Sequence, residues 1–445
     1  MPKTSVIEDS IGYLAHLQPK KVLLLGDLMQ DVYTYGRVQR ISPEAPVPVF
    51  QVDSESSMPG GAGNVALNLA GLRCQVKLVA RLGQDGAGHR LVQQLQEMSG
   101  KLIDSSYIVF ENDYQTPVKN RLIASSQQLL RLDREKPYQE LQALTRAQML
   151  KNALSLLDEV DIVAVSDYGK GGIDRALLGP IFEKARALGK PVIVDPKSKD
   201  FSLYKGASLI KPNLKEALEI KGASSGDLAD IASYVMKELP DLEYLLVTRS
   251  QEGLSLFSRQ KPRADFPARS FEVIDVTGAG DCVLAALVLS MACALPIDVG
   301  CHLANVAGSI AIQHLGCVQL TFKELSKHIL KLDAHNKIFD ERHLFALQEA
   351  CRGEKVHLIR VDLDEIHSIE FILKLEKHRT SYPDILLLVE VHTQDVQSQW
   401  IDFLARQQGV DFVLLSTSSL EKSGKIEPHQ LWQWSRQERV FTPAS

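Results

Sequence analysis

The sequence lacks several features that would place it in a common class of protein. Its 445 residues include six cysteines but no C-x-x-C pair, which argues against a zinc site and against a disulfide scaffold. We therefore expect buried free thiols in a reducing compartment. There is no long run of one charge, and 50 lysines and arginines against 55 aspartates and glutamates leave a formal net charge of −5. The composition therefore gives no reason to expect a nucleic-acid partner.

Long apolar segments are missing as well. The uncharged segment from Cys282 to Ile297 lies between Asp281 and Asp298 and is shorter than the roughly 20 residues that a membrane-spanning helix needs. We expect a buried core helix there. The first residues also lack the basic-then-apolar order of a signal peptide. These observations predict a cytoplasmic protein without membrane contact, and the chain length favours two domains.

What the sequence does contain is a series of short apolar runs separated by segments of helical length. This pattern predicts a parallel α/β sheet covered by helices on both faces, with strands at Val22–Leu25, Ile162–Val165, Val192–Val194 and Leu245–Val247. Ligands of such sheets bind beyond the carboxyl ends of the strands. Polar pairs follow three of these runs and predict a single cleft: Gly26-Asp27, Ser166-Asp167 and Asp195-Pro196.

Two stretches depart from the α/β rhythm and predict a small separate sheet. One is Val47–Val52, and the other runs from Tyr107 to Asp133 with alternation at Tyr107–Phe110, Val118–Ile123 and Leu129–Leu132. Such a sheet could act as a lid that excludes water from a reacting group, and two lids could pair their edges in a homodimer. The alternative is a surface hairpin with no catalytic part.

The segment Asp275 to Asp281 reads D-V-T-G-A-G-D and leads into the apolar helix. Small residues at a helix start let backbone N–H groups converge on an anion, which the helix dipole also favours. We predict an anion hole for phosphate at Gly278, Ala279 and Gly280. A carboxylate at its end would repel phosphate unless it takes a proton from an attacking hydroxyl, so Asp281 is the predicted general base.

The segment Met58 to Asn68 reads M-P-G-G-A-G-N-V-A-L-N. Gly60 and Gly61 would let a polar ligand touch the backbone, and Asn64 can donate and accept hydrogen bonds with sugar hydroxyls. The alternative for Asn64 is a helix N-cap. Asp27 and Asp31 follow the first strand and are predicted to bind vicinal hydroxyls, although core or capping roles remain open for either one.

A third segment, Lys211 to Glu216, reads K-P-N-L-K-E. Asn213 and Glu216 would share one side of a helix and could hold waters of a nucleotide-bound magnesium, although the same spacing also fits a purely structural capping box. Thr248-Arg249 follows a predicted strand and could reach nucleotide phosphate. Ser166 to Gly172 forms a flexible turn that places Lys170 near anionic ligands.

Residues from about 12 to 330 resemble the ribokinase-like family of sugar kinases, whose signatures are the early Gly-Gly segment and the late G-A-G-D segment. Within this family, four segments resemble the D-glycero-β-D-manno-heptose 7-phosphate kinase branch: Arg40–Val49, Gln127–Asp133, Ser166–Gly171 and Asp195–Lys197. The resemblance implies ATP-dependent phosphorylation of the heptose C1 hydroxyl. The product would be the 1,7-bisphosphate on the route to ADP-heptose for lipopolysaccharide core.

The resemblance also implies residue roles, with ATP and Mg²⁺ as cofactors. Asp281 becomes the base, Asn213, Leu214, Lys215 and Glu216 the ATP and magnesium segment, with Glu216 holding the metal through water, and Asn305 a neighbour of adenine. Asp31, Gly60, Gly61 and Asn64 become sugar contacts. Apart from the resemblance, we predict Thr248 and Arg249 as further nucleotide contacts and Asp27, Glu44, Asp167 and Lys170 as further substrate contacts. Ser125 and Ser126 replace an arginine that the branch commonly shows, so a phosphate clamp must come from Lys119, Arg121 or Arg131.

We expect this kinase-like domain to span residues 1–332 and a smaller α/β domain to span residues 336–445. The second domain has apolar runs at Val356–Val361, Ile385–Val391 and Phe412–Leu415, with helices expected near Ile369–His378 and Gln397–Gln408. It contains all three tryptophans, Trp400, Trp432 and Trp434.

The second domain resembles, in position and length, the nucleotidyltransferase that is often fused to such kinases, whose signature is T-N-G-C-F-D-x-L-H-x-G-H. Asp364 and His367 align with the aspartate and the first histidine, but Ile369 replaces the glycine and Glu370 the second histidine. Losing one phosphate-stabilising donor costs roughly 3 to 4 kcal/mol, and a carboxylate repels the same oxygens. We predict a degenerate domain without adenylyltransferase activity, which stabilises the chain, dimerises or docks an unknown protein.

Three alternatives remain open from the sequence. The chain could phosphorylate another sugar or sugar phosphate. It could be a non-catalytic regulatory binding protein, although Asp275, Gly278, Gly280 and Asp281 are all intact. Finally, the second domain could retain adenylyltransferase chemistry through unfamiliar residues.

Overall fold

The protein is described from a computed structural model that covers residues 11–125, 127–136, 139–220, 227–268, 273–332, 337–393, 398–416, 430–435 and 440–443. The chain divides into two compact units. The larger unit is residues 18–321, and the smaller unit combines residues 1–17 with residues 322–445. Helix α10 (Phe322–Leu332) therefore groups with the smaller unit, whereas the sequence places it at the end of the first domain.

The larger unit is built on a nine-stranded sheet in the order β15-β14-β13-β12-β11-β10-β1-β4-β6. All neighbours from β13 to β6 pair in parallel, and β14 and β15 add an antiparallel edge. The four strands expected from the sequence are confirmed as β1 (Lys21–Gly26), β10 (Ile162–Ser166), β11 (Val192–Asp195) and β13 (Tyr244–Thr248). The other strands are β4 (Gln75–Val79), β6 (Ile103–Asp104), β12 (Leu209–Ile210), β14 (Leu254–Ser258) and β15 (Ala264–Phe266).

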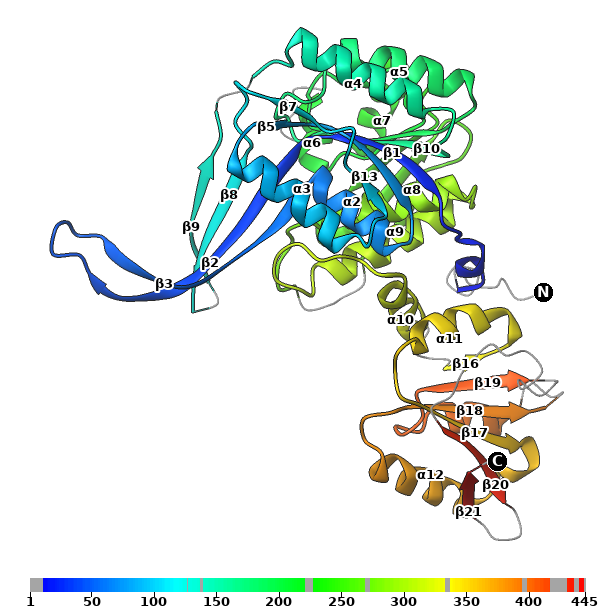
Figure 1. Cartoon of the computed structure of the whole chain (residues 1–445). Helices are drawn as coiled ribbons and strands as arrows, with labels where there is room; N and C mark the ends of the chain where they lie inside the picture. Colours follow the sequence, from blue (N-terminus) through cyan, green and yellow to red (C-terminus); the bar gives the residue numbers. More distant parts are fainter. Residues whose placement is uncertain are drawn as a thin grey trace. The chain divides into compact units, whose positions relative to one another are not determined.

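Helices cover both faces of this sheet (Figure 1). One face carries α4 (Ala143–Leu156), α5 (Arg175–Ala187) and α7 (Leu228–Glu238), whose apolar side chains share a core with β1, β10, β11 and β13. The other face carries α2 (Ala62–Gly71), α3 (Gly86–Met98), α8 (Ala279–Ala292) and α9 (Ile297–Ala311). Helix α8 is buried from Asp281 to Ser290, so the uncharged segment does form a core helix.

Among the described residues, no helix combines the length and the apolar character needed to cross a bilayer. The six cysteines are free thiols, and all are buried except Cys293, which is partly exposed.

A second sheet in the order β3-β2-β8-β9 projects from the larger unit and is called the lid here (Figure 1). Its strands are β2 (Leu28–Ile41), β3 (Pro48–Gly61), β8 (Val118–Ala124) and β9 (Gln127–Arg134). The prediction of a separate sheet is right for three of its segments. It is wrong for Tyr107–Phe110, because β7 (Val109–Glu111) pairs instead with β5 (Arg81–Gly83). The long strand β2 was not expected, because its first half is buried on both faces and shows no alternation.

The smaller unit contains a six-stranded sheet in the order β16-β19-β18-β17-β20-β21. The three expected strands are present as β17 (Val356–Asp362), β18 (Leu386–His392) and β19 (Phe412–Ser416), and the two expected helices as α12 (Ile369–Ser381) and α13 (Gln399–Ala405). The remaining elements are β16 (Ile338–Phe339), α11 (Leu344–Cys351), β20 (Gln430–Ser435) and β21 (Val440–Pro443). Only β21 runs antiparallel to its neighbour.

Candidate active site

The carboxyl ends of β10 to β13 open into a cavity of about 800 Å³, a size typical of small-molecule sites. Helices α8 and α9 form its other wall. The polar and small residues that line it come from segments far apart in the sequence: Asp167, Tyr168, Asp195, Lys197, Lys211, Asn213, Glu216, Thr248, Ala279, Gly280, Asn305, Gly308 and Ser309. The prediction that polar residues following separate strands meet in one cleft holds for Asp167 and Asp195 but not for Asp27, which does not line this cavity.

Asp281 lies in the first turn of α8, directly after the cavity-lining Gly280, and only 2% of its surface is exposed. Its Oδ1 accepts a hydrogen bond from the Tyr168 hydroxyl at 2.7 Å, and its Oδ2 accepts one from Asn64 Nδ2 at 2.7 Å. Burial raises the pKa of this carboxyl to about 6, and the two hydrogen bonds act in the opposite direction. The group is thus ionised at neutral pH but binds protons more readily than an ordinary aspartate, as a general base requires.

The predicted anion hole begins at Gly278, the N-cap of α8, with φ of 76°. A Cβ here would lie 2.7 Å from Asn64 Nδ2, so this position requires glycine. The Ala279 amide donates to the Val276 carbonyl at 3.3 Å, a long bond that an arriving anion would have to replace. A helix N-terminus that opens into a cavity favours negative charge.

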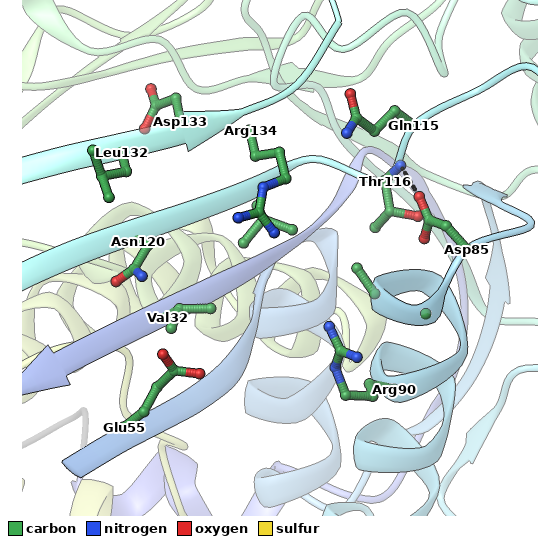
Figure 2. Close-up of a pocket in the computed structure, with 13 residues that line it drawn as sticks. Val32, Glu55, Asp85, Arg90, Gln115, Thr116, Asn120, Leu132, Asp133 and Arg134 are labelled. Atoms are coloured by element: carbon green, nitrogen blue, oxygen red, sulfur yellow. Dashed lines mark hydrogen bonds between the residues drawn. The ribbon is translucent and has the colours of Figure 1, made fainter. Parts of the chain in front are cut away.

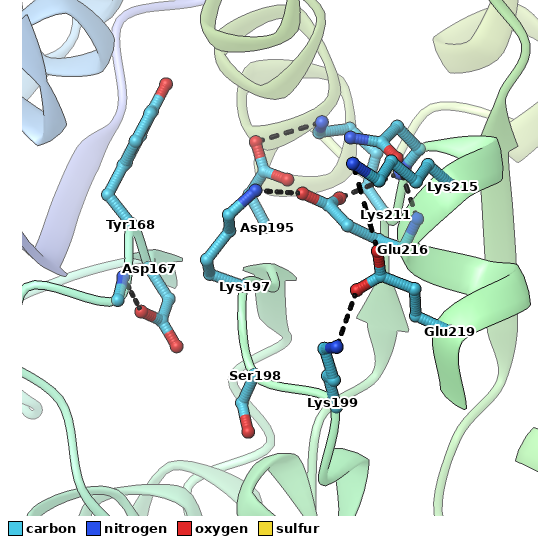
Figure 3. A network of polar contacts seen from close by, with 12 residues as sticks. Asp167, Tyr168, Asp195, Lys197, Ser198, Lys199, Lys211, Lys215, Glu216 and Glu219 are labelled. Carbon is cyan, nitrogen blue, oxygen red and sulfur yellow. Dashed lines mark hydrogen bonds and ion pairs between the residues drawn. The ribbon is translucent and has the colours of Figure 1, made fainter. Parts of the chain in front are cut away.

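A lysine lies beside this helix start. A Cβ added to Gly280 would be 3.7 Å from Lys211 Nζ, and Lys211 is only 3% exposed. Its ammonium pairs with Asp195 at 2.9 Å (Figure 3). Burial raises the pKa of Asp195 to about 6, whereas Lys211 lowers it. The sequence places Asp195 at the cleft but gives neither residue a part in binding or catalysis. Their positions at the ends of apolar strand segments were the available signal.

Asn213 and Glu216 form a reciprocal capping box at the start of α6 (Leu214–Ile220). The Asn213 amide donates to Glu216 Oε2 at 3.0 Å, and the Glu216 amide donates to Asn213 Oδ1 at 2.8 Å. The structural alternative is therefore present, and Glu216 also pairs with Lys197 at 3.0 Å (Figure 3). Both residues line the cavity, so the binding of magnesium through water remains a prediction for them.

The other predicted nucleotide residues divide into two groups. Thr248 and Asn305 line the cavity, and Asn305 Nδ2 donates to the Pro267 carbonyl at 2.9 Å. The other three are used elsewhere. The Arg249 guanidinium is bonded to Glu252 and Asp265, the Lys215 side chain is 87% exposed, and Leu214 packs against the apolar core.

The lid carries an ion pair between Asp31 on β2 and Arg121 on β8. Asp31 Oδ1 accepts from Arg121 Nη1 at 2.6 Å, and Asp31 is 4% exposed. A Cβ at Gly60 would lie 2.0 Å from Asp31 Oδ2, so glycine there is required for the position of this carboxylate. Lys119 lies two residues from Arg121 on β8, and its ammonium is 5.7 Å from the centre of the Tyr168 ring. Burial lowers the pKa of Lys119.

Two predicted sugar contacts have other roles in this structure. Asp27 accepts the amides of Tyr168, Lys170 and Gly172, each at 2.9 Å, so its carboxylate anchors a loop and is not open to a ligand. Asn64 is 0% exposed inside α2 and donates to Asp281. It is not the helix N-cap either, because that residue is Gly61, which follows Gly60 at the end of β3.

Four further predicted sugar contacts are used in protein contacts or lie on the surface. Glu44 is in the exposed turn between β2 and β3. Arg131 is bonded to Asp133 at 2.8 Å, and Lys170 to Glu135 at 2.6 Å. Asp167 lines the cavity but accepts the Tyr204 hydroxyl at 2.6 Å. Burial raises its pKa to about 6.

A second cavity of about 540 Å³ lies at the base of the lid (Figure 2). It is lined by Val32 and Asn120, which neighbour Asp31 and Arg121 in sequence. Because side chains alternate along a strand, this is the opposite face of the lid. Its charged residues are Glu55, Asp85, Arg90, Asp133 and Arg134, and none of the residues predicted for the site is among those lining it.

In the smaller unit, the residues aligned with the nucleotidyltransferase signature lie on the surface. Asp364, His367, Ile369 and Glu370 are all exposed, and Ile369 is exposed to 77% at the first position of α12. The His367 ring lies 4.7 Å from the Trp400 ring. No glycine occurs at this helix start.

Comparisons with known proteins agree with this geometry. The profile of the pfkB family carbohydrate kinases matches residues 19–323. The chain is 41% identical over 324 residues to "Bifunctional protein HldE" of Caulobacter vibrioides, covering 72% of this chain and 66% of that protein. It is 38% identical over 366 residues to the protein of the same name from Shewanella piezotolerans, covering 80% and 74%. The match with the first relative thus spans just under two thirds of that relative's length.

Solved structures show the same fold at low sequence identity. Phosphofructokinase-2 from Escherichia coli, in complex with substrates and products, is 19% identical with a TM-score of 0.58, and the match covers 71% of this chain and 100% of that one. Ribokinase of Arabidopsis thaliana, complexed with ribose and ATP, is 19% identical with a TM-score of 0.55, covering 70% and 99%. The chain belongs to the pfkB family of carbohydrate kinases, with a ribokinase-like α/β fold and the activity class of an ATP-dependent sugar kinase.

Proposed function

We propose that the protein phosphorylates the C1 hydroxyl of D-glycero-β-D-manno-heptose 7-phosphate with ATP, on the route to ADP-heptose. The observation that carries the reaction type is the buried Asp281 at the start of α8, next to the small residues of the predicted anion hole. The substrate assignment is supported by the name of the two relatives at 41% and 38% identity and by the four segments that resemble the heptose 7-phosphate kinases.

In this proposal Asp281 takes the proton from the sugar hydroxyl while the sugar oxygen forms a bond to the γ-phosphorus. The bond from that phosphorus to the ADP oxygen breaks, and ADP leaves. The helix start at Gly278 to Gly280 and the nearby Lys211 ammonium stabilise the charge on the transferred group. Magnesium on the nucleotide would neutralise phosphate charge, and the proposed ligands for its waters are Asn213 and Glu216.

The sugar would lie between the lid and Asp281. Asp31 and Arg121 offer an acceptor and donors there, and the Tyr33 hydroxyl is buried without a hydrogen-bond partner among the described residues. A buried hydroxyl without a partner is consistent with a polyhydroxylated ligand at this place. For the 7-phosphate we propose Lys119 and Arg121, because both lie on β8 next to Tyr168 and Asp31, whereas Arg131 lies on the edge strand β9 and pairs with Asp133.

A panel of acceptors tests this assignment. Heptose 7-phosphate, ribose, fructose and fructose phosphates are each incubated with Mg-ATP and the full chain, and phosphorus NMR identifies the phosphorylated position. We expect turnover at C1 of the heptose phosphate at a kcat/KM at least tenfold above that of any other acceptor. Higher turnover with another sugar would transfer the activity to that sugar, and binding without ADP release would favour a regulatory protein.

For the smaller unit we propose a non-catalytic role in stabilising the chain, in dimerisation or in docking an unidentified protein. The exposed Glu370 and Ile369 at the start of α12 do not form a phosphate site, because a carboxylate repels phosphate oxygens and a branched side chain blocks approach to the backbone. In this proposal a different protein carries out the adenylyl transfer.

We also propose that the lid mediates a homodimer. The lid exposes large apolar side chains, including Val52 at 59%, Leu130 at 52% and Leu132 at 48%. These side chains lie on β3 and β9, the two edge strands of the lid, where the strands of a second copy could pair. The cytoplasmic location stays a prediction from the sequence.

A further inference from the structure

Tyr168 makes the contact that bears most directly on Asp281. Its hydroxyl donates to Asp281 Oδ1 at 2.7 Å, while Asn64 Nδ2 donates to Oδ2 at 2.7 Å. Each carboxylate oxygen therefore already holds a hydrogen-bond donor. Each oxygen keeps a further lone pair, but of the two donors only Tyr168 lines the cavity, so a sugar hydroxyl that approaches Asp281 from the cavity competes with the phenol.

The two donors differ in how easily they can leave. Asn64 is fully buried within α2, and its Oδ1 accepts from Asn68 Nδ2 at 3.2 Å. Tyr168 lines the cavity, whereas its hydroxyl is buried against Asp281. An arriving hydroxyl therefore displaces Tyr168 and leaves Asn64 in place.

The backbone around Tyr168 is held independently of its side chain. Asp27 accepts the amides of Tyr168, Lys170 and Gly172, so displacement involves rotation of the side chain and no movement of the loop. The ring lies within cation–π distance of Lys119 on β8. The lid strand that also carries Arg121 thus contacts the residue that covers the base.

We propose that Tyr168 is a positioning residue whose hydroxyl occupies the carboxylate oxygen of Asp281 that would accept a proton. It thereby suppresses ATP hydrolysis until a sugar displaces it. This inference rests on the proposed kinase reaction. In the side reaction, a water would give a proton to Asp281 while its oxygen bonded to the γ-phosphorus and the bond to the ADP oxygen broke, releasing ADP and inorganic phosphate. The phenol keeps that water out.

The phenol is itself a poor acceptor for phosphate. Burial raises the pKa of Tyr168 well above its usual value of 10, whereas the pKa of Asp281 is about 6. The proton therefore stays on the phenol oxygen, which remains a donor to the carboxylate and a weak nucleophile. The same hydrogen bond lowers the pKa of Asp281 and so keeps the base ionised at neutral pH.

The full chain carrying Tyr168→Phe tests the proposal by ADP release from Mg-ATP without any sugar. We expect hydrolysis to rise roughly 10- to 100-fold, the range that corresponds to the loss of one hydrogen bond to a charged group. The acid limb of the pH profile of kcat/KM for the sugar, which reports the free enzyme, should move to higher pH, because the lost hydrogen bond had lowered the pKa of Asp281. Tyr168→Leu tests the same point with a side chain that fills less of the place.

Tyr204→Phe is the matched control, because it also removes a buried phenol-to-carboxylate bond, that from Tyr204 to Asp167 Oδ2 at 2.6 Å. Tyr204→Phe should lower the melting temperature about as much as Tyr168→Phe does. It should neither raise ATP hydrolysis nor move the acid limb, because its hydrogen bond does not reach Asp281. The proposal is overturned if both Tyr168 variants hydrolyse ATP at the parent rate with an unmoved acid limb, or if Tyr204→Phe raises hydrolysis equally.

The failure of this inference can be separated from the failure of the proposed function, because the hydrolysis measurement needs no sugar. If no acceptor in the panel is phosphorylated, but Tyr168→Phe raises hydrolysis and adding Asp281→Asn abolishes it, the substrate assignment falls and the role of Tyr168 stands. If the heptose phosphate is phosphorylated and the Tyr168 variants hydrolyse no faster, the reverse holds.

Discussion

Each of the two units packs helices on a mainly parallel sheet, and the helix starts of α8 and α12 differ in chemistry. Helix α8 begins with Gly278, Ala279 and Gly280, and its first acidic residue, Asp281, is 2% exposed. Helix α12 begins with Ile369, 77% exposed, followed by an exposed Glu370. The comparison teaches that sheet topology supplies a position for a site. Phosphoryl transfer also requires small residues at the helix start, which leave its backbone amides accessible, and a carboxylate whose pKa burial has raised.

The largest effect that separates the two helix starts is expected from their acidic residues. Asp281→Asn removes the proposed base and should lower kcat about 10³-fold, within the usual range for a lost general base. Thermal stability should not fall, because a buried carboxylate with a raised pKa opposes folding at neutral pH. Glu370→Gln is the matched change in α12 and should leave kcat unaltered. A coupled ADP-release assay with melting curves measures both, and an Asp281→Asn rate within a few-fold of the parent would remove Asp281 from its role.

With the kinase silenced by Asp281→Asn, the smaller unit can be assayed alone in the full chain. Labelled ATP and heptose 1-phosphate should give no pyrophosphate above the level without protein, if Ile369 and Glu370 replace the glycine and the second histidine of the nucleotidyltransferase signature as proposed. Pyrophosphate release that disappears in a further His367→Ala variant would show instead that the second unit is catalytic.

A smaller effect is expected where the lid meets the site. Gly60→Ala would place a Cβ 2.0 Å from Asp31 Oδ2, and the carboxylate must move. Overpacking of this kind costs roughly 1 to 3 kcal/mol, so we expect kcat/KM for the sugar to fall roughly 10- to 100-fold, mainly through KM. Gly179→Ala in α5, where no heavy atom lies within 4 Å, is the control and should keep the parent kinetics. Equal kinetics for the two variants would contradict a role for the Gly60–Asp31 contact.

The smallest expected effect is a difference in the pH dependence of stability. In the larger unit, burial raises the pKa of Asp167, Asp195 and Asp281 to about 6. The folded unit binds these protons before the unfolded chain does, so this contribution to stability grows as the pH falls from about 7 toward 4.

The smaller unit should respond with the opposite sign. Burial, together with the neighbouring His357 at 2.9 Å, lowers the pKa of His378 to about 4. The unfolded chain then binds the proton first, and stability is lost as the pH falls from about 6.5 to 4. All tryptophans lie in this unit, so the melting temperature followed by their fluorescence should fall by a few degrees from pH 7 to pH 5. A fluorescence transition that rises with acid would contradict this assignment.

The sequence predicts the elements that buried apolar runs define and the cleft at their carboxyl ends. It predicts the helix start that carries Asp281 and the three small residues before it, because this pattern lies within one short segment of the sequence. It does not predict which donors reach Asp281, since Asn64 and Tyr168 come from distant segments. It misassigns Asp27, because only the folded loop shows that three amides occupy its carboxylate. Strand β2 escapes prediction because burial on both faces removes the alternation on which the prediction relies.

The reciprocal hydrogen bonds between Asn213 and Glu216 make the first turn of a seven-residue helix depend on the side chains proposed to face the metal. If the side-chain oxygens of Asn213 and Glu216 bound the waters of magnesium more tightly, their hydrogen bonds to the backbone amides would weaken. Stronger hydrogen bonds to those amides would in turn weaken the binding of the hydrated ion. Natural variation at either position is thereby constrained from two directions at once, and hydrogen exchange at the amides of residues 213 and 216 would report directly on how tightly the metal is held.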